Sequence, residues 1–165
     1  MKTRLPIVLL MSAIGLTGCD QPQDVPQDKQ LVTNEATAPI ERWYSAAQIQ
    51  RGDPLYQTNC AECHKADASG TSNWMQPNPD GKFPPPPLNG SAHTWHHSLT
   101  VLRRTIKLGG ERLGGTMPGF ADKLNDEEID DILAWVQSHW SEEIYRVWHE
   151  RDAQDVERQQ LSTKH

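Results

Sequence analysis

The chain has 165 residues and only three cysteines, Cys19, Cys60 and Cys63, which are too few for a framework of structural disulfides. Its longest apolar run, from Leu5 to Leu16, has about a dozen residues, whereas a membrane-spanning helix needs about twenty. Basic residues are also in the minority, because 16 lysines and arginines stand against 22 aspartates and glutamates, for a net charge of -6. These absences argue against a disulfide scaffold, a membrane-spanning helix and a nucleic-acid-binding surface.

Two of the cysteines belong to the sequence Cys60-Ala61-Glu62-Cys63-His64, in which two thiols are followed directly by a histidine. This C-x-x-C-H pattern is typical of covalent haem attachment: each thiol adds to a vinyl group, and the histidine reaches the iron from the proximal face. A thioredoxin-like dithiol and half of a zinc site are the alternatives, but zinc needs four ligands and no second cysteine pair exists. The pattern predicts one covalent haem c held by Cys60 and Cys63, with His64 as an axial iron ligand.

The third cysteine ends a short leader. Lys2 and Arg4 precede the apolar run, which is the layout of a secretory signal. The run ends at Cys19 in the letters L-T-G-C, which resemble the lipobox of bacterial lipoproteins, where cleavage precedes the cysteine and lipid is attached to it. We therefore expect residues 1–18 to be a lipoprotein signal peptide and Cys19 to be lipidated. The alternative is ordinary signal cleavage near Gly18, which would leave a free cysteine.

Residues 19–42 form a polar segment that cannot bury enough apolar surface to offset its ordering entropy, so we expect a flexible tether to a membrane. Loss of the leader would remove two of the 16 basic residues and leave a net charge of -8. Such a charge favours redox partners with basic docking patches. The expected location is the periplasmic side of a bacterial membrane, and Asp20 resembles the residue that keeps some lipoproteins at the inner membrane.

The pattern of a capping box predicts where two helices begin. Ser45 with Gln48 starts a helix that runs toward the first motif cysteine, and Pro54 is expected to kink or break it near Gly52. The second capping box starts a strong helix at Asn125, whose apolar residues recur at helical spacing and should face the core. These residues are Ile129, Ile132, Leu133, Val136 and Trp140.

A third helix is expected from Leu99 to Leu108, with Ser98 as its N-cap and Gly109 as its stop. Residues 65–97 are rich in loops and prolines, so they should wrap irregularly around the haem. Residues 141–165 continue helical spacing before a mixed-charge stretch, which predicts a further helix that frays at its end.

A second iron ligand is expected in the glycine-rich loop before the helix that starts at Asn125. There, Met117 is followed by Pro118 and can present its thioether sulfur to the distal face of the iron. Met75 lies in a polar run before the prolines and is a poorer candidate. His93, His96 and His97 offer the competing ligands, if their loop folds over the haem edge.

These features together resemble the class I cytochromes c over residues of about 45–140. The family has a glycine and an aromatic residue eight and four positions before its first motif cysteine, and this chain has Gly52 and Tyr56 there. In the family, the terminal helix crosses the first helix at that glycine. The resemblance assigns this crossing to Ile132 and Trp135.

The same resemblance extends to the haem pocket. The proline loop of the family supplies a carbonyl that accepts the ring N–H of the proximal histidine, which implies that Pro86 is the partner of His64, and a leucine that packs on haem, here Leu88. Met117 takes the place of the distal ligand of the family. The fold class implied is all-α: three to four core helices around one covalent haem at residues 43–140, plus a helical extension at 141–165.

The function that the resemblance implies is one-electron transfer between redox proteins, without catalytic residues of its own. Three histidines and Trp95 in residues 91–97 have no counterpart in the shared core of the family. Three roles stay open for these residues: ligands of a copper or zinc ion, polar surface, or hydrogen-bond donors near the haem propionates. Two other functions stay open: a peroxidase or sensor if the sixth iron position is free, and a haem subunit or assembly factor of a larger oxidoreductase.

Overall fold

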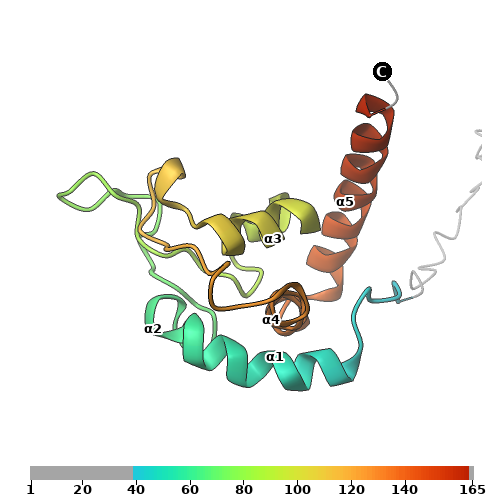
Figure 1. Ribbon diagram of the computed structural model, residues 1–165, viewed down its shortest axis with the longest axis horizontal. Coiled ribbons are helices and arrows are strands. Elements are labelled where there is room, and N and C mark those ends of the chain that lie inside the picture. The colour runs from blue at the N-terminus through green and yellow to red at the C-terminus, as the bar shows by residue number, and fades with distance from the viewer. Residues whose placement is uncertain (1–38, 164–165) are drawn as a thin grey trace, which may run out of the picture. The chain divides into compact units, whose positions relative to one another are not determined.

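The computed structural model describes residues 39–163, and all regular structure within that range is helical (Figure 1). This confirms the prediction of an all-α fold. An isolated bridge pairs Phe83 with Gly115. The lipoprotein signal expected at residues 1–18, Cys19 and most of the tether expected at 19–42 lie outside the described residues. The helices are α1 (Ala46–Asn59), α2 (Ala61–His64), η1 (His93–His96), α3 (Leu99–Leu108), η2 (Glu111–Leu113), α4 (Asp126–Ser138) and α5 (Glu142–Ser162).

The first helix begins as its sequence predicts but is not broken. The Ser45 side chain accepts from the backbone N–H of Gln48, and the Gln48 side chain accepts from that of Ser45, so the capping box is complete. Of the kink or break expected near Gly52, the break does not occur, because α1 continues through Pro54. Pro54 and Gln50 both lie on the exposed side of α1. Water can therefore bond to the Gln50 carbonyl that loses its partner, and the helix survives the proline.

Packing of α1 against α4 forms the centre of the core. A β-carbon on Gly52 would lie 1.9 Å from the backbone oxygen of Asp131, so only a glycine allows this approach. One turn along, the Tyr56 ring stacks on Trp135 at a centroid distance of 4.0 Å. Arg51 closes the contact with two bonds to the buried Asp131 carboxylate, at 2.7 and 2.8 Å. The resemblance assigned the crossing to Ile132 and Trp135. In the structure Gly52 faces Asp131 and Trp135, so Trp135 lies at the crossing as expected and Asp131 takes the place of Ile132.

Helix α3 has the bounds that the sequence predicts, with Leu102 and Ile106 buried. Ser98 occupies the N-cap position, but its side chain makes no capping bond. Instead, the carboxylate of Asp152 in α5 accepts from the backbone N–H of Leu99 at 2.7 Å. The start of α3 is therefore stabilised by a residue 53 positions later in the chain, which no local pattern could predict.

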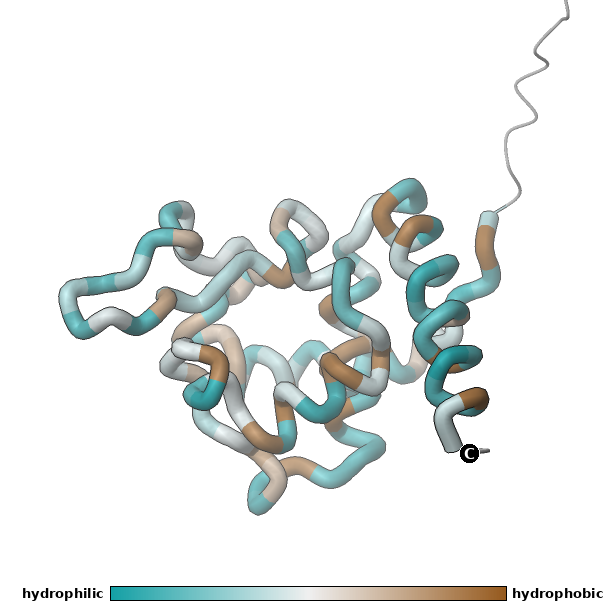
Figure 2. The backbone as a smooth tube through the Cα atoms, turned by 90° about the horizontal axis from the view of Figure 1, so that it is seen from above, coloured by the Kyte–Doolittle hydropathy of each residue, from teal (hydrophilic) through white to brown (hydrophobic). Residues whose placement is uncertain are grey.

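The C-terminal extension packs on the core and holds the segment before α1. Tyr145 and Trp148 of α5 are buried. The Tyr145 hydroxyl accepts from the backbone N–H of Trp43 at 3.1 Å, and the Trp43 indole donates to Gln137 at 2.7 Å. The outer turns of α5 are mostly hydrophilic (Figure 2) and stay helical to Ser162, further than the frayed end we expected. In residues 39–163, no helix has the length and apolar content needed to cross a membrane.

Candidate haem-binding site

The C-x-x-C-H motif forms one tight helical turn directly after α1. The backbone N–H of Cys60 still bonds to Tyr56 at 2.8 Å, and the N–H of His64 bonds to the Cys60 carbonyl at 2.8 Å. Both cysteines are free thiols, with Cys60 half-buried and Cys63 exposed. Burial raises the pKa of the Cys60 thiol to about 11, so it stays protonated near neutral pH. The turn therefore presents two unpaired thiols and one histidine from consecutive residues.

The imidazole of His64 is buried and oriented by the proline loop. Its Nδ1 lies 2.9 Å from the backbone oxygen of Pro86. A carbonyl only accepts, so the contact assigns the proton to Nδ1 and leaves the lone pair of Nε2 free. Burial lowers the pKa of His64, and the Pro86 bond opposes that shift. The side chain is therefore neutral near pH 7, which is the form that binds a metal.

The Pro86 carbonyl is itself held in place by the loop that follows the motif. Gly70 has a φ of 55°, and a β-carbon there would lie 2.5 Å from the Pro86 oxygen. Leu88, expected in the haem pocket, is half-buried; its N–H donates to Ala68 at 2.8 Å, and its carbonyl accepts from the Trp140 indole at 2.8 Å. The sequence alone did not point to the role of Gly70 or to the bond from the Trp140 indole. For Gly70, the signal in the sequence was a glycine six residues after His64.

Met117 is half-buried in the loop between η2 and α4 and packs against the core. Its backbone oxygen accepts from Gly110 at 2.9 Å, and Gly109 has a φ of 78° beside the same oxygen. The structure thus joins Met117 to the end of α3 and His64 to the proline loop, so separate segments hold the two expected iron ligands. Met75, the poorer candidate, has 68% of its surface exposed.

Residues 91–97, the histidine loop, contain η1. The hydroxyl of Thr94 in this loop donates to the backbone oxygen of Pro87 at 3.0 Å, which joins it to the proline loop of residues 84–88. The His93 ring stacks on Trp74 at 4.5 Å, and His97 meets His93 edge-on at 5.4 Å. His96 is exposed. No group of three or more histidine, cysteine, aspartate or glutamate side chains that could hold a metal ion occurs within residues 39–163. The copper or zinc site that the sequence left open therefore has no support in this loop.

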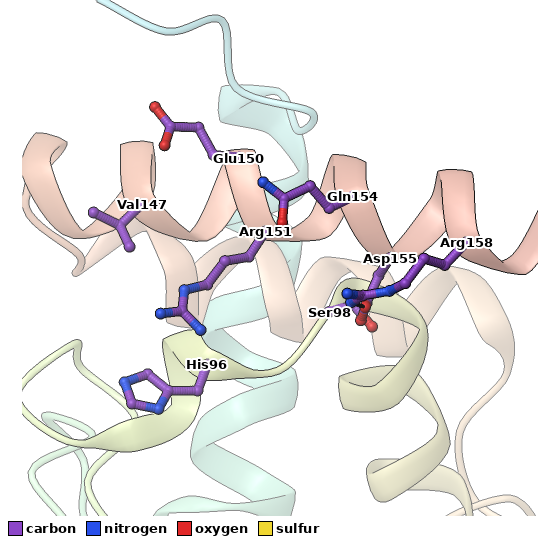
Figure 3. Close-up of a pocket in the computed structure, with 8 residues that line it drawn as sticks. All are labelled: His96, Ser98, Val147, Glu150, Arg151, Gln154, Asp155 and Arg158. Atoms are coloured by element: carbon purple, nitrogen blue, oxygen red, sulfur yellow. Dashed lines mark hydrogen bonds and ion pairs between the residues drawn. The ribbon is translucent and has the colours of Figure 1, made fainter.

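A polar cavity of about 470 Å³ lies between α5 and the segment that joins η1 to α3 (Figure 3). It is lined by none of the motif residues, by neither Pro86 nor Leu88 and not by Met117, although His96, one of the competing iron ligands, does line it. Arg151 extends toward His96, while Glu150 points away from both. The cavity is therefore distinct from the candidate haem site. Its lining residues are His96, Ser98, Val147, Glu150, Arg151, Gln154, Asp155 and Arg158.

The donors around the motif fit haem c. Two free thiols can form thioethers, a neutral imidazole keeps Nε2 free, and a thioether is available in a separate loop. The proline carbonyl supplies the support that iron-bound histidines usually have on their second nitrogen.

Comparison with known proteins gives the same class. Thiosulfate dehydrogenase of Allochromatium vinosum is 35% identical over 89 residues, which are 53% of this chain and 30% of that protein. The cbb3-type cytochrome c oxidase subunit FixP of Sinorhizobium medicae is 28% identical over 96 residues, which are 54% of this chain and 29% of that protein. Cytochrome c6 of Synechocystis sp. is 29% identical over 91 residues, which are 55% of this chain and 65% of that protein.

The chain thus spans less than a third of the length of the first two relatives. No solved structure matches it. The family model described as cytochrome c oxidase, cbb3-type, subunit III matches residues 47–136, a range that contains the C-x-x-C-H motif, the proline loop and Met117. Since this match covers more than half of the chain, the protein belongs to the cbb3-type cytochrome c oxidase subunit III family and carries a c-type cytochrome domain.

Proposed function

We propose that this protein is a periplasmic electron carrier, tethered to a membrane through a lipid on Cys19, with one haem c bound by His64 and Met117. The observation that carries the proposal is the contact between His64 and Pro86, because it prepares a neutral imidazole with a free Nε2. Haem c, when bound, supplies an iron that accepts and releases one electron.

In this proposal the protein side chains hold and orient the cofactor. Cys60 and Cys63 fix the porphyrin covalently, so it cannot dissociate between electron transfers. His64 and Met117 would be the two protein ligands of the iron, and with both bound no ligand position would be left for a substrate. Thioether ligation and burial stabilise the reduced iron, so a positive reduction potential is expected. No acid or base is needed for the transfer.

The net charge of -8 that remains after loss of the leader supports partners with basic docking patches, since electron-transfer encounters are weak and guided by charge. The lipid anchor is supported by the L-T-G-C pattern at Cys19 and by the polar residues that follow it. Asp20 favours the inner membrane.

A second candidate function is a fixed haem subunit or an assembly factor of a larger oxidoreductase. It is favoured by several relatives, which are subunits of a cbb3-type oxidase, a quinone alcohol dehydrogenase and a gluconate 2-dehydrogenase. Helix α5 also lies outside the matched range of 47–136. Extraction in mild detergent would separate the two functions, because a fixed subunit would co-purify with its complex and a carrier would not.

The test of the carrier function is the sixth iron ligand. Met117→Ala should abolish the absorption band that marks sulfur-to-iron ligation, lower the reduction potential and let carbon monoxide bind the ferrous protein. Met75→Ala is the matched control, because it removes an exposed methionine outside the expected site. Replacement of His93, His96 and His97 by glutamine should leave these properties unchanged. An unchanged spectrum, potential and carbon monoxide affinity in Met117→Ala would contradict both the ligand assignment and the carrier function.

An open sixth position in the parent protein would instead support a peroxidase or a gas sensor. That outcome would be visible before any mutation, as carbon monoxide binding by the unmodified ferrous protein.

A further inference from the structure

The two segments that hold the expected iron ligands meet at a backbone contact. Phe83, the residue before the proline loop, donates its N–H to the backbone oxygen of Gly114 at 2.9 Å. It also forms a parallel bridge with Gly115, two positions before Met117. In Figure 1 the segment that leads into the prolines and the segment after η2 run side by side. The loop of Met117 is therefore attached to the loop that orients His64.

The side chain of Phe83 adds to this contact. A β-carbon on Gly114 would lie 3.5 Å from the Phe83 ring, so the ring packs against the backbone of this glycine. Gly114 has a φ of 85°, in the left-handed region that favours glycine. The Phe83 side chain stays 43% exposed, so it is an edge contact rather than part of the core. Phe83 thus contacts the Met117 loop through both its backbone and its ring.

The four prolines after Phe83 connect this contact stiffly to the carbonyl that meets His64. Each proline ring fixes its own φ, and a residue before a proline is restricted to extended conformations. Every residue from Phe83 to Pro86 is followed by a proline, so this whole stretch is confined. An extended proline segment advances about 3.1 Å per residue, which separates Phe83 from Pro86 by roughly 9 Å. The stretch can therefore act as a spacer of nearly fixed length.

The proline run is also anchored to the rest of the domain. The backbone oxygen of Pro85 accepts from the N–H of Thr71 at 2.9 Å, and that of Pro87 accepts from the hydroxyl of Thr94 at 3.0 Å. Pro87 is buried. Prolines have no N–H, so carbonyl bonds of this kind are the way in which the backbone of the run is fixed. The spacer is thus held in place as well as stiff.

On the other side of the contact, the Met117 loop is closed on itself. The N–H of Gly110 donates to the backbone oxygen of Met117 at 2.9 Å, and the oxygen of Gly110 accepts from the N–H of Gly115 at 3.1 Å. Gly115 and Met117 are therefore both bonded to one residue at the end of α3. A displacement of Gly115 at its bridge with Phe83 would carry Met117 with it.

We propose that Phe83 and Pro84–Pro87 form a brace that sets the position of Met117 relative to His64. Phe83 holds the Met117 loop, and the carbonyl of Pro86 holds the imidazole. The proposal rests on the proposed function, because it requires both side chains to bind the iron of one haem. Phe83 and Pro84 are positioning residues in this proposal, since they act on the iron through Met117.

The experiment measures how firmly Met117 is held on the oxidised iron of the holoprotein. Added imidazole competes for its position, and the loss of the sulfur-to-iron band gives the midpoint concentration. The double variant Pro84→Gly/Pro85→Gly keeps every carbonyl of the run but removes its stiffness. We expect its midpoint to be about tenfold lower than that of the parent, because two prolines no longer restrict the open conformations of the loop.

A matched control makes the same change outside the brace. Pro77→Gly/Pro79→Gly replaces two exposed prolines of the same long loop and should leave the midpoint unchanged. Haem staining on a denaturing gel checks that all variants keep covalent haem. If the double variant at Pro84 and Pro85 does not keep it, the variants of Phe83 decide the question.

These variants test the other end of the brace. Phe83→Ala removes the ring from Gly114 and should lower the imidazole midpoint, whereas Phe83→Tyr keeps the ring and should match the parent. Hydrogen exchange at the amide of residue 83, which donates to Gly114, should be faster in Phe83→Ala and in the Pro84→Gly/Pro85→Gly variant. A change in exchange together with the midpoint would connect the contact to the iron ligand.

Midpoints equal to that of the parent in both brace variants, with the sulfur-to-iron band present, would overturn this proposal and leave the carrier function intact. Equal shifts in the brace and control double variants would also overturn it, because they would assign the effect to the loss of any proline in the loop. Absence of the sulfur-to-iron band from the parent protein would instead overturn the ligation by Met117 in the proposed function, and this inference with it.

Discussion

The backbone of Gly52 in α1 lies directly against the backbone carbonyl of Asp131 in α4, so that an added β-carbon would sit 1.9 Å from its oxygen. This distance is far below any van der Waals contact between a carbon and an oxygen. Because α1 leads into the C-x-x-C-H turn, the glycine determines how closely that turn can approach the core helix.

We expect Gly52→Ala to destabilise the holoprotein by about 3 kcal/mol, because the new methyl group meets rigid backbone rather than a movable side chain. Helix propensity alone predicts the opposite sign, a gain of about 1 kcal/mol. Denaturant unfolding separates the two effects. Gly110→Ala is the matched control, since its φ is -106° and its nearest atom would be 3.5 Å away. Equal stability of both variants and the parent would show that the helices can move apart at no cost.

Much of the helical framework was predictable because its signals are local. Ser45 and Asn125 form the predicted capping boxes, and α3 has the expected bounds. Pro54 misled the prediction, because the sequence does not show that its side of α1 faces solvent. The capping of α3 by Asp152 was also out of reach, since it depends on where α5 packs.

The candidate haem site likewise has one part that could be predicted from the sequence and one part that could not. The contact between His64 and Pro86 was expected from the resemblance to a family, and the structure contains it. The support of that carbonyl by Gly70 was not foreseen, because it depends on a loop whose path no periodicity describes. The roles of Cys60, Cys63, His64, Leu88 and Met117 toward haem, and the lipid on Cys19, remain predictions.

Glu142 should hold the start of the domain against α5 in a pH-dependent way. Its carboxylate accepts from the backbone N–H of Ile40 at 3.0 Å and pairs with Arg42 at 2.7 Å. The Ile40 bond, followed by Arg42, lowers the pKa of Glu142 from its usual value of 4.5. A lowered pKa means that the contact stabilises the fold fully above pH 4.5, and that this contribution is lost as the pH falls through the folded-state value.

Hydrogen exchange at the Ile40 amide measures this effect. Protection in the parent should be high at neutral pH and fall on acidification below pH 4.5, whereas Glu142→Gln should show lower protection that depends little on pH in this range. Glu143→Gln removes the same charge from the neighbouring residue and should behave like the parent. Identical protection in the two variants would assign the effect to net charge rather than to this contact.

Lipidation of Cys19 predicts where the protein is found in the cell. Several acyl chains, at about 0.8 kcal/mol per buried methylene, would make attachment to a bilayer effectively permanent. Cys19→Ala should therefore move the protein from the membrane fraction to the soluble periplasmic fraction, without loss of its visible spectrum. If the variant stays in the membrane pellet as fully as the parent, the anchor is elsewhere or the protein is held by a partner.

The last prediction concerns Gly70, which supports the Pro86 carbonyl. An alanine there would have to keep a φ of 55° and place its β-carbon 2.5 Å from the carbonyl oxygen, so either the loop or Pro86 must move. Movement of Pro86 would weaken its bond to Nδ1 of His64 and make the imidazole a poorer donor to iron. A poorer donor stabilises the oxidised iron less. We therefore expect the reduction potential of Gly70→Ala to rise, together with a loss of stability of about 3 kcal/mol.

The control separates this effect from backbone strain alone. Gly81 also has a positive φ, 75°, but an added β-carbon there would meet nothing within 4 Å. Gly81→Ala should therefore show only the cost of a left-handed backbone, about 1 kcal/mol, and an unchanged potential. Protein-film voltammetry and denaturant unfolding of both variants give the comparison. A shift in neither variant would show that Gly70 acts on stability alone, and a shift in both would assign the change to backbone strain in general. A shift only in Gly70→Ala would connect this glycine to the iron through Pro86 and His64.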